Sequence, residues 1–318
     1  MASYVFKLIR PDEISRDFPY RLRYRLEDPA LARSVAKRGV LHPILTAGPE
    51  RTVVSGHRRF QAACDLGLKE IGTFEIQGPV SGEDLFILAL LSNWNQGWSD
   101  LDRALAVRRA VETYRMDETL LEEVLPALGL TPQRHVADEY LQVARLHPFL
   151  LELIADGRLV FRGAKILTRF SAADQETFGR SVALKAAFSA NQLLQVGEWL
   201  QDLLKLEKTD LKTYVETHGL ETILDHPVQD RRAKADRLHA ALRALRFPRI
   251  AGQEKKFSAF SRELREESGD LTVEAPAFFE GEGFILKARV RKPESLERVL
   301  EILSRRRNSL NSLFEIML

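Results

Sequence analysis

The sequence contains a single cysteine, Cys64, among 318 residues. One cysteine forms no internal disulfide, no CxxC redox pair and no zinc site that needs two thiolates, so a reducing compartment is expected. No run of about 18 apolar residues is present, and the sequence therefore predicts no membrane-spanning helix. Charges interrupt the first apolar residues, which is not typical of a signal peptide. These absences predict a cytoplasmic protein without a membrane partner.

The chain also lacks an excess of charge of one sign. It has 47 lysines and arginines against 45 aspartates and glutamates, for a formal net charge of +2. The strongly basic composition of many nucleic-acid binders is missing. A polyanionic partner would therefore have to be bound by positive groups concentrated at particular places. The seven histidines are scattered, and no HExxH pattern indicates a zinc enzyme.

Residues 1–80 combine short apolar runs with turn signals. One helix is expected after Asp28, ending at Gly39, and a second helix is expected from Arg58 until Gly67 stops it. Strands are expected at residues 5–9, 43–46, 52–54 and 74–76. The pattern predicts a small mixed α/β domain.

Two further regions follow. Residues 81–208 have helical apolar periodicity almost throughout and predict an all-helical domain. Residues 230–318 begin with a basic helix at 231–246 and continue with a charged helix up to 267, strands at 271–273 and 284–288, and a last helix from 293. They predict a small α+β domain, which is a candidate for dimerisation. The fold class expected for the whole chain is α+β.

The most informative segment is a strand, a glycine turn and a helix start with two adjacent arginines, Ser55-Gly56-His57-Arg58-Arg59. Free amides at a helix N-terminus, the helix dipole and guanidinium groups together favour phosphate oxygens. The segment therefore predicts an anion site. The alternative is a solvated helix start in which the arginines pair with Asp65 or Glu70.

A second pattern is typical of a helix-turn-helix. An amphipathic stretch at 120–128 is followed by Gly129, and Thr131-Pro132 is expected to cap and open a second helix that runs to residue 145. Such a second helix offers its first residues to the major groove of DNA. Here these are Gln133, Arg134 and His135, of which glutamine suits adenine and arginine suits guanine. An ordinary helical hairpin is the alternative.

These segments, taken in order, resemble the ParB family of chromosome and plasmid partition proteins. The resemblance rests on Gly39-Val40-Leu41-His42-Pro43, on the arginine motif at 55–59 and on the stretch at 92–96, and it continues through the helix-turn-helix to about residue 204. It implies a CTP site with Mg²⁺, in which Gly39, His42 and Pro43 flank the base and ribose. Gly56, His57, Arg58 and Arg59 would hold the triphosphate, Ser55 would belong to the same nucleotide site, and Asn93 would lie at the metal.

The same resemblance implies double-stranded DNA as a partner, a homodimer associated with the nucleoid, and a ParA-type ATPase. In the DNA-binding domain it points to residues at the tip of the second helix and just beyond it, namely Thr131, Gln133, Arg134, His135, Arg162 and Lys165. The implied function is partition of a chromosome or plasmid, with the nucleotide acting as a switch of a DNA clamp.

Several positions depart from the family pattern. Ser92 stands where glutamate is usual, Gln96 stands where arginine is usual, and Gly163 stands where histidine is usual. Magnesium prefers carboxylate oxygens. We therefore expect the chain to bind CTP and to hydrolyse it weakly at most. The related sulfiredoxins have a reactive cysteine at the position of Gly56. Cys64 lies instead in an apolar helix pattern and is expected to be a buried, inert thiol.

Other functions stay open on the sequence alone. A transcriptional or phage-derived regulator could use the same modules without partition. A nuclease or nucleotide-hydrolysing enzyme of this fold would need clustered carboxylates, and the sequence has none around Gly56 or Asn93. Trp94 and Trp98 are expected to pack in a core, with stacking on a base as the alternative. The basic helix at 231–246 is either a DNA phosphate contact or a solvated face.

Overall fold

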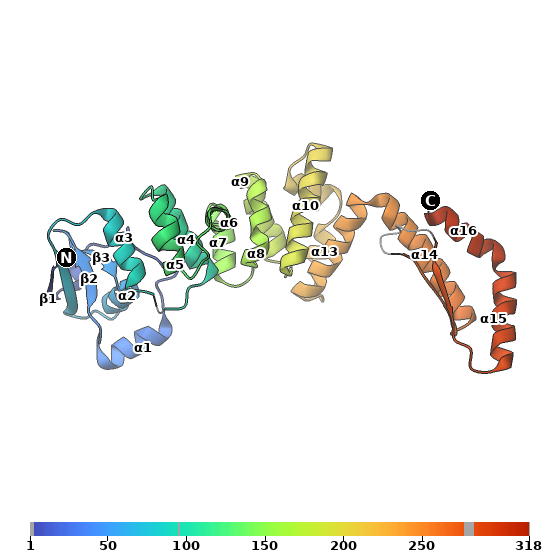
Figure 1. Ribbon diagram of the computed structural model, residues 1–318, viewed down its shortest axis with the longest axis horizontal. Coiled ribbons are helices and arrows are strands. Elements are labelled where there is room, and N and C mark those ends of the chain that lie inside the picture. The colour runs from blue at the N-terminus through green and yellow to red at the C-terminus, as the bar shows by residue number, and fades with distance from the viewer. Residues whose placement is uncertain (1–2, 95, 277–282, 318) are drawn as a thin grey trace. The chain divides into compact units, whose positions relative to one another are not determined.

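The computed structural model describes residues 3–94, 96–276 and 283–317. The chain divides into two units (Figure 1). The first unit comprises Met1–Glu198 and Asp210–Ala235, and the second unit comprises Trp199–Thr209 and Asp236–Leu318. No helix in the described ranges is both long and apolar enough to cross a membrane.

The first unit opens with a four-stranded sheet in the order β1-β4-β2-β3. Strand β4 pairs antiparallel with β1 and parallel with β2, and β2 pairs antiparallel with β3. The strands are β1 (Ser3–Ile9), β2 (Ile44–Ala47), β3 (Thr52–Ser55) and β4 (Ile71–Gln77). Strands thus lie at all the positions where the sequence predicts them.

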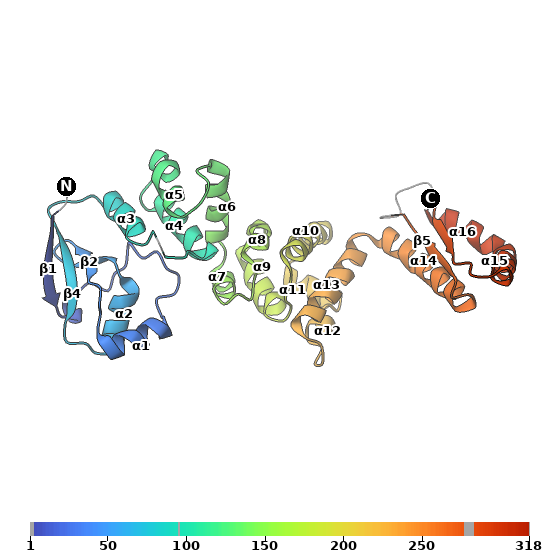
Figure 2. The same ribbon diagram turned by 60° about the horizontal axis from the view of Figure 1, so that its bottom comes forward.

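Two helices accompany this sheet, and a single 3₁₀ turn, Pro11–Glu13, follows β1. Helix α1 (Pro29–Arg38) begins where the Asp28 carboxylate accepts hydrogen bonds from two amides of the first turn, and it ends at Gly39. Helix α2 (His57–Asp65) begins directly after β3, at Gly56. Phe60 on α2 packs with sheet residues in a buried apolar cluster, so α2 is fixed against one face of the sheet (Figure 2).

The other face of the sheet joins the core of the helical part. Val54 of β3 and Ile76 of β4 share one buried cluster with Phe86 and Leu90 of α3 (Gly82–Leu91) and with Val107 of α4 (Asp100–Glu112). Because residues alternate between the two faces of a strand, β3 contributes Val53 to one core and Val54 to the other. The end of β3, where α2 begins, is therefore held from both sides.

Most of the helices that follow lie in the first unit, and the two longest of them, Ala190–Glu207 and Arg231–Arg246, run from the first unit into the second. A π-helical turn (Leu120–Val124) leads into α5 (Leu125–Ala127), followed by α6 (Arg134–Ala144), α7 (Pro148–Ala155), α8 (Phe161–Ala164), a 3₁₀ turn (Lys165–Arg169), α9 (Ala172–Thr177), a second π-helical turn (Phe178–Ala183), α10 (Ala190–Glu207), α11 (Leu211–Thr217), α12 (Glu221–Leu224) and α13 (Arg231–Arg246). The expected all-helical region is confirmed.

The start of α6 differs from the prediction. The sequence predicts Thr131 as its N-cap and Pro132 as its first residue, but α6 begins at Arg134, and Gln133 precedes it in extended conformation. The Gln133 amide donates to the Thr131 carbonyl at 2.8 Å. This tight turn around Pro132 replaces the first helical turn, so Thr131 caps nothing.

The second unit also contains a small α+β arrangement. Its elements are α14 (Pro248–Glu267), β5 (Leu271–Glu274), β6 (Ile285–Ala288), α15 (Pro293–Arg305) and α16 (Arg307–Met317), with β5 and β6 paired antiparallel. A buried cluster that includes Phe257, Leu264 and Val299 joins α14 to α15. Two helices stand where the sequence predicts one last helix, and Gly252 lies inside α14 rather than before it.

Candidate functional site

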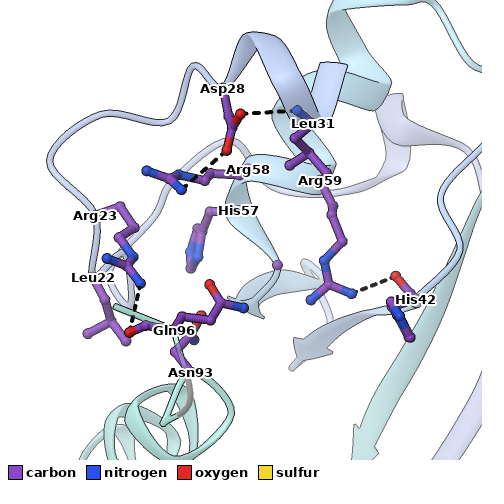
Figure 3. A pocket seen from close by; sticks show the side chains of 11 residues that line it. Leu22, Arg23, Asp28, Leu31, His42, His57, Arg58, Arg59, Asn93 and Gln96 are labelled. Atoms are coloured by element: carbon purple, nitrogen blue, oxygen red, sulfur yellow. Dashed lines mark hydrogen bonds and ion pairs between the residues drawn. The ribbon is translucent and has the colours of Figure 1, made fainter. Parts of the chain in front are cut away.

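A pocket of about 390 Å³ lies in the first unit, at the N-terminal end of α2 (Figure 3). Its walls come from the segment before α1, the turn before β2, the start of α2 and the residues after α3. The lining residues are Leu22, Arg23, Asp28, Leu31, His42, Gly56, His57, Arg58, Arg59, Asn93 and Gln96. Four segments that are separated along the chain thus meet in one cavity.

Glycine is required at the start of α2. Gly56 has a φ of +97°, in the left-handed region. A Cβ added there would lie 2.8 Å from Cγ2 of the Ile44 side chain. No side chain caps α2, and its first helical hydrogen bond runs from the Phe60 amide to the Gly56 carbonyl. The amides of residues 57–59 therefore have no partner within the helix and give this end a positive partial charge.

Arg59 is a half-buried cation, and its side chain is oriented by carbonyl groups. Its Nη1 donates to the carbonyls of His42 at 2.6 Å and Pro43 at 2.8 Å. Burial lowers the pKa of Arg59. No ion pair found in the described ranges involves Arg59, and Asp65 instead accepts from Gln61. The alternative in which Arg59 pairs with Asp65 is therefore wrong, and the guanidinium has a deficit of nearby negative charge.

Arg58 is held more loosely. Its Nη1 lies 3.4 Å from Oδ2 of Asp28, and its Nε lies 3.4 Å from the carbonyl of Arg25. Both distances exceed the usual range of hydrogen bonds. Asp28 uses its other oxygen to cap α1. Arg58 thus faces the pocket with a weak hold on its own protein partners.

His57 is buried beneath the pocket, with 8% of its surface exposed. Burial is the main cause that lowers its pKa to about 4, and the charge of Arg109 adds to this effect. The ring donates to the carbonyl of Val53 and meets Phe18 edge to face. Its Nε2 atom is buried without a hydrogen-bond partner in the described structure. His57 is therefore neutral at pH 7 and has an unused acceptor.

Asn93 lies in the pocket wall contributed by the end of α3. Its Nδ2 donates to the carbonyl of Ala89 at 2.7 Å and to the hydroxyl of Ser55 at 3.4 Å. Its amide oxygen is the atom left for a ligand. Of the residues the structure describes, no group of three or more His, Cys, Asp or Glu could hold a metal ion. The pocket thus offers a magnesium ion one amide oxygen and the carboxylate of Asp28, which is already engaged. This set of ligands does not fit a magnesium ion coordinated by the protein.

The structure also places in the pocket residues that sequence reasoning missed. Arg23 donates to Asp102 at 3.0 Å and to the carbonyl of Gly97 at 2.7 Å, and its guanidinium lies 4.4 Å from the ring centroid of Trp98. The segment around Arg23 has no apolar periodicity that would have drawn attention to it. Trp98 packs against the core as expected, but the expectation of core packing is wrong for Trp94, which is 62% exposed.

Three expected nucleotide residues, Gly39, Pro43 and Ser55, are not among the residues that line the pocket. Gly39 ends α1 with a φ of +70°. Pro43 orients Arg59 through its carbonyl, and buried Ser55 accepts from Asn93. Pro43 and Ser55 thus support residues of the wall, whereas His42 and the 56–59 segment line it.

The helix-turn-helix pattern forms a turn and an exposed helix tip. Gly129, with a φ of +68°, ends the helix α5, and the first residues of the next segment, Thr131, Gln133, Arg134 and His135, are all exposed. Arg134 contacts Asp117 and lies 3.6 Å from Asp138. Leu141 and Ala144 are buried on the opposite face of α6. The tip is therefore exposed, with Arg134 held by surface ion pairs, while the opposite face of the helix is buried.

The next segment lies beside this helix. The rings of Tyr140 on α6 and Phe161 on α8 are 5.2 Å apart, and α6 packs on the turn at 165–169. Arg162 and Lys165 are both exposed there. A Cβ at Gly163 would lie 2.9 Å from the carbonyl oxygen of Ala190, which explains why glycine rather than a larger residue occupies this position.

Comparisons with known proteins give matches among solved structures. No family model and no curated protein matches this chain. A C-terminally truncated ParB from Caulobacter crescentus complexed to the centromeric parS site is 16% identical, covers 60% of this chain and 98% of its own, and has a TM-score of 0.36. The same kind of ParB complexed with CTP-γ-S is 20% identical over 54% and 98% of the two chains, with a TM-score of 0.25. A Pnob8-like ParB-N domain is 12% identical over 77% and 97%, with a TM-score of 0.37. All three of these solved structures are of ParB proteins.

Proposed function

We propose that this chain is a ParB-like DNA-binding protein of chromosome or plasmid partition, controlled by a nucleoside triphosphate of the CTP type. The observation that carries the proposal is the pocket at α2, where free helix amides and the guanidinium of Arg59 converge. Burying the Arg59 guanidinium without a negative partner costs free energy, and an anionic ligand would offset that cost. The volume of about 390 Å³ lies within the range of small-molecule sites.

The DNA partner is supported by the exposed tip of α6. Gln133 and Arg134 carry the amide and guanidinium groups that read base edges in the major groove. Arg162 and Lys165, on the segment that packs beside α6, supply positive charge for phosphates. With a net charge of only +2, binding depends on these placed groups rather than on bulk charge.

A physical connection between the two sites supports a switch. Arg23, in the pocket wall, pairs with Asp102, which also forms the capping box that starts α4. Helix α4 packs against α6. A triphosphate that moves Arg23 would therefore act on the helix that supports the DNA-reading helix. Through these contacts a bound nucleotide would change the affinity for DNA.

A homodimer is supported by α15 in the second unit. Leu296 and Leu300 on α15 are 46% and 57% exposed, although Val299 and Ile302 on its neighbouring face are buried. The apolar stripe of this helix is thus wider than the core that covers it. A second copy would cover the rest, bringing two DNA-binding helices together on nucleoid DNA, where a ParA-type ATPase would act on the dimer.

The nucleotide assignment is tested by calorimetric titration of CTP into the full chain. Arg59→Ala should abolish binding because it removes the counter-charge for phosphate. Arg33→Ala is the matched control, since Arg33 is exposed on α1 outside the pocket. Equal affinity of wild type and Arg59→Ala would contradict the assignment.

The DNA assignment needs the target sequence, which a genome-wide map of bound DNA supplies. Arg134→Ala should then cost about 1–3 kcal/mol of binding free energy at that site. An unchanged footprint would show that α6 does not read bases. A target within promoters, with no ParA-type ATPase encoded nearby, would favour a transcriptional regulator built from the same modules over a partition protein.

A further inference from the structure

The pocket is rich in guanidinium groups and poor in carboxylates. Arg23, Arg58 and Arg59 all line it, whereas Asp28 is the one carboxylate among the described residues of its lining. A metal site for a nucleotide normally combines protein carboxylates with phosphate oxygens, because Mg²⁺ prefers oxygen ligands that carry charge. This pocket instead has more positive than negative side chains, and the positive side chains can contact phosphate oxygens directly.

We propose that this pocket binds the nucleoside triphosphate without a protein-held divalent cation, with guanidinium groups and helix amides taking the place of the metal. The inference rests on the proposed function and names the form of its ligand, a metal-free triphosphate. Arginine suits this role because its planar donors contact two phosphate oxygens at once.

The carboxylate of Asp28 is already engaged. Its Oδ1 accepts from the amides of Ala30 at 3.1 Å and Leu31 at 3.0 Å, and its Oδ2 faces Arg58. A metal on Oδ1 would compete with the cap of α1, and a metal on Oδ2 would displace Arg58 and leave its guanidinium beside a cation. The Asp28 carboxylate therefore stabilises the fold, and coordination of a metal would cost it one of these contacts.

The next carboxylate behind the wall is engaged as well. Asp102 is 6% exposed and accepts from Arg23 at 3.0 Å and from the Tyr24 amide at 2.9 Å. On the wall formed after α3, Asn93 and Gln96 carry neutral amides. Ser92, exposed at the end of α3, donates its hydroxyl to the carbonyl of Leu88. No free carboxylate thus faces the phosphates from the described wall.

A second, independent observation indicates that the pocket is built for a ligand. His57 lines it, is more than nine-tenths buried, and has no partner for Nε2. Figure 3 shows its ring beneath Arg58, on the pocket side of α2. A buried polar atom without a partner is costly in the free protein. A ligand that donates a hydrogen bond, such as a nucleotide hydroxyl, would satisfy this atom.

The test is a calorimetric titration of CTP into the full chain, in EDTA and in magnesium chloride. The affinity in EDTA is expected to equal or exceed that in magnesium, because free CTP carries more negative charge to meet the arginines. Binding more than about tenfold weaker in EDTA, or about 1.4 kcal/mol, would overturn this inference and leave the proposed function standing. Absence of binding in both solutions would overturn the two together.

A charge-changing variant sharpens the test. Gln96→Glu adds a carboxylate at the pocket rim and removes no side-chain hydrogen bond that the structure shows. It should weaken binding in EDTA by about tenfold, and magnesium should restore the affinity. Gln96→Ala is the neutral control and should behave alike in both solutions. An affinity of Gln96→Glu in EDTA equal to that of wild type would contradict the placement of the phosphates beside this wall.

Discussion

Replacement of Gly56 by alanine tests how the anion site is built. Alanine would have to keep a φ of +97°, which costs about 1–2 kcal/mol for an L-residue. Its Cβ would also lie 2.8 Å from Cγ2 of Ile44. Ile44 is fully buried, so it cannot move freely, and overpacking of this kind costs about 1–3 kcal/mol. The expected total is about 2–5 kcal/mol, a large fraction of the stability of a typical domain.

Gly67→Ala is the matched control. Gly67 follows the same helix with a φ of +61°, and an added Cβ there meets nothing within 4 Å. Both variants stiffen the unfolded chain equally, so the difference between them reflects mainly the close contacts of a Cβ at position 56, with Ile44 first among them. Urea unfolding followed by circular dichroism gives both free energies. If Gly56→Ala were no more destabilising than Gly67→Ala, the tight approach of α2 to β2 described above would be refuted.

Three further outcomes are expected. Asp102→Ala should lower the free energy of unfolding by about 3–5 kcal/mol, measured in urea, because it leaves the guanidinium of Arg23 buried without its carboxylate; a loss below 1 kcal/mol would contradict this. Burial holds the pKa of His57 near 4, well below its ordinary 6.5. Between these two pH values the imidazole is protonated in the unfolded chain and neutral in the folded chain. Stability should thus fall by up to about 3 kcal/mol as the pH drops from 6.5 towards 4, and His57→Gln should lack that part of the pH dependence. Gly163→Ala should destabilise the first unit by about 1–3 kcal/mol, as its Cβ meets the Ala190 carbonyl at 2.9 Å, and an unchanged melting temperature would be evidence against this packing.

Local sequence signals predict the parts of the site that local physics determines. The segment at 55–59 combines a strand end, a glycine and a helix start within a few residues, and the structure places Gly56, Arg58 and Arg59 in one pocket wall. The fold class follows from apolar periodicity in the same way. In both cases the decisive contacts are between neighbours in sequence.

The partners of these residues depend on distant contacts and could not be predicted. Arg59 is oriented by the carbonyl groups of His42 and Pro43, and Arg58 faces Asp28. Every residue has a backbone carbonyl, so the residue types of a sequence do not indicate which carbonyl will accept a hydrogen bond. The alternative with Asp65 considered only neighbours on the same helix, which is why it fails.

Turn chemistry caused the error at α6. Proline after threonine is typical of a capped helix start, but here the Thr131 carbonyl accepts a bond from the Gln133 amide and delays the helix by two residues from the predicted Pro132 to Arg134. The later start makes Arg134 the first residue of α6 rather than the third. Arg134 therefore lies at the tip of α6, where the sequence also predicts it, and its contact with a base stays a prediction.

The one thiol of the chain offers an experimental handle on α2. Cys64 is half-buried near the C-terminal end of this helix, and burial raises the pKa of its thiol. A maleimide dye would therefore react slowly at neutral pH, yet it would give one product at one position. The attachment point would lie about 10 Å along the helix axis from His57, so the dye would share a rigid element with the anion-binding amides while staying clear of them. Its fluorescence would report ordering of α2 by a ligand without any change to the residues that bind it.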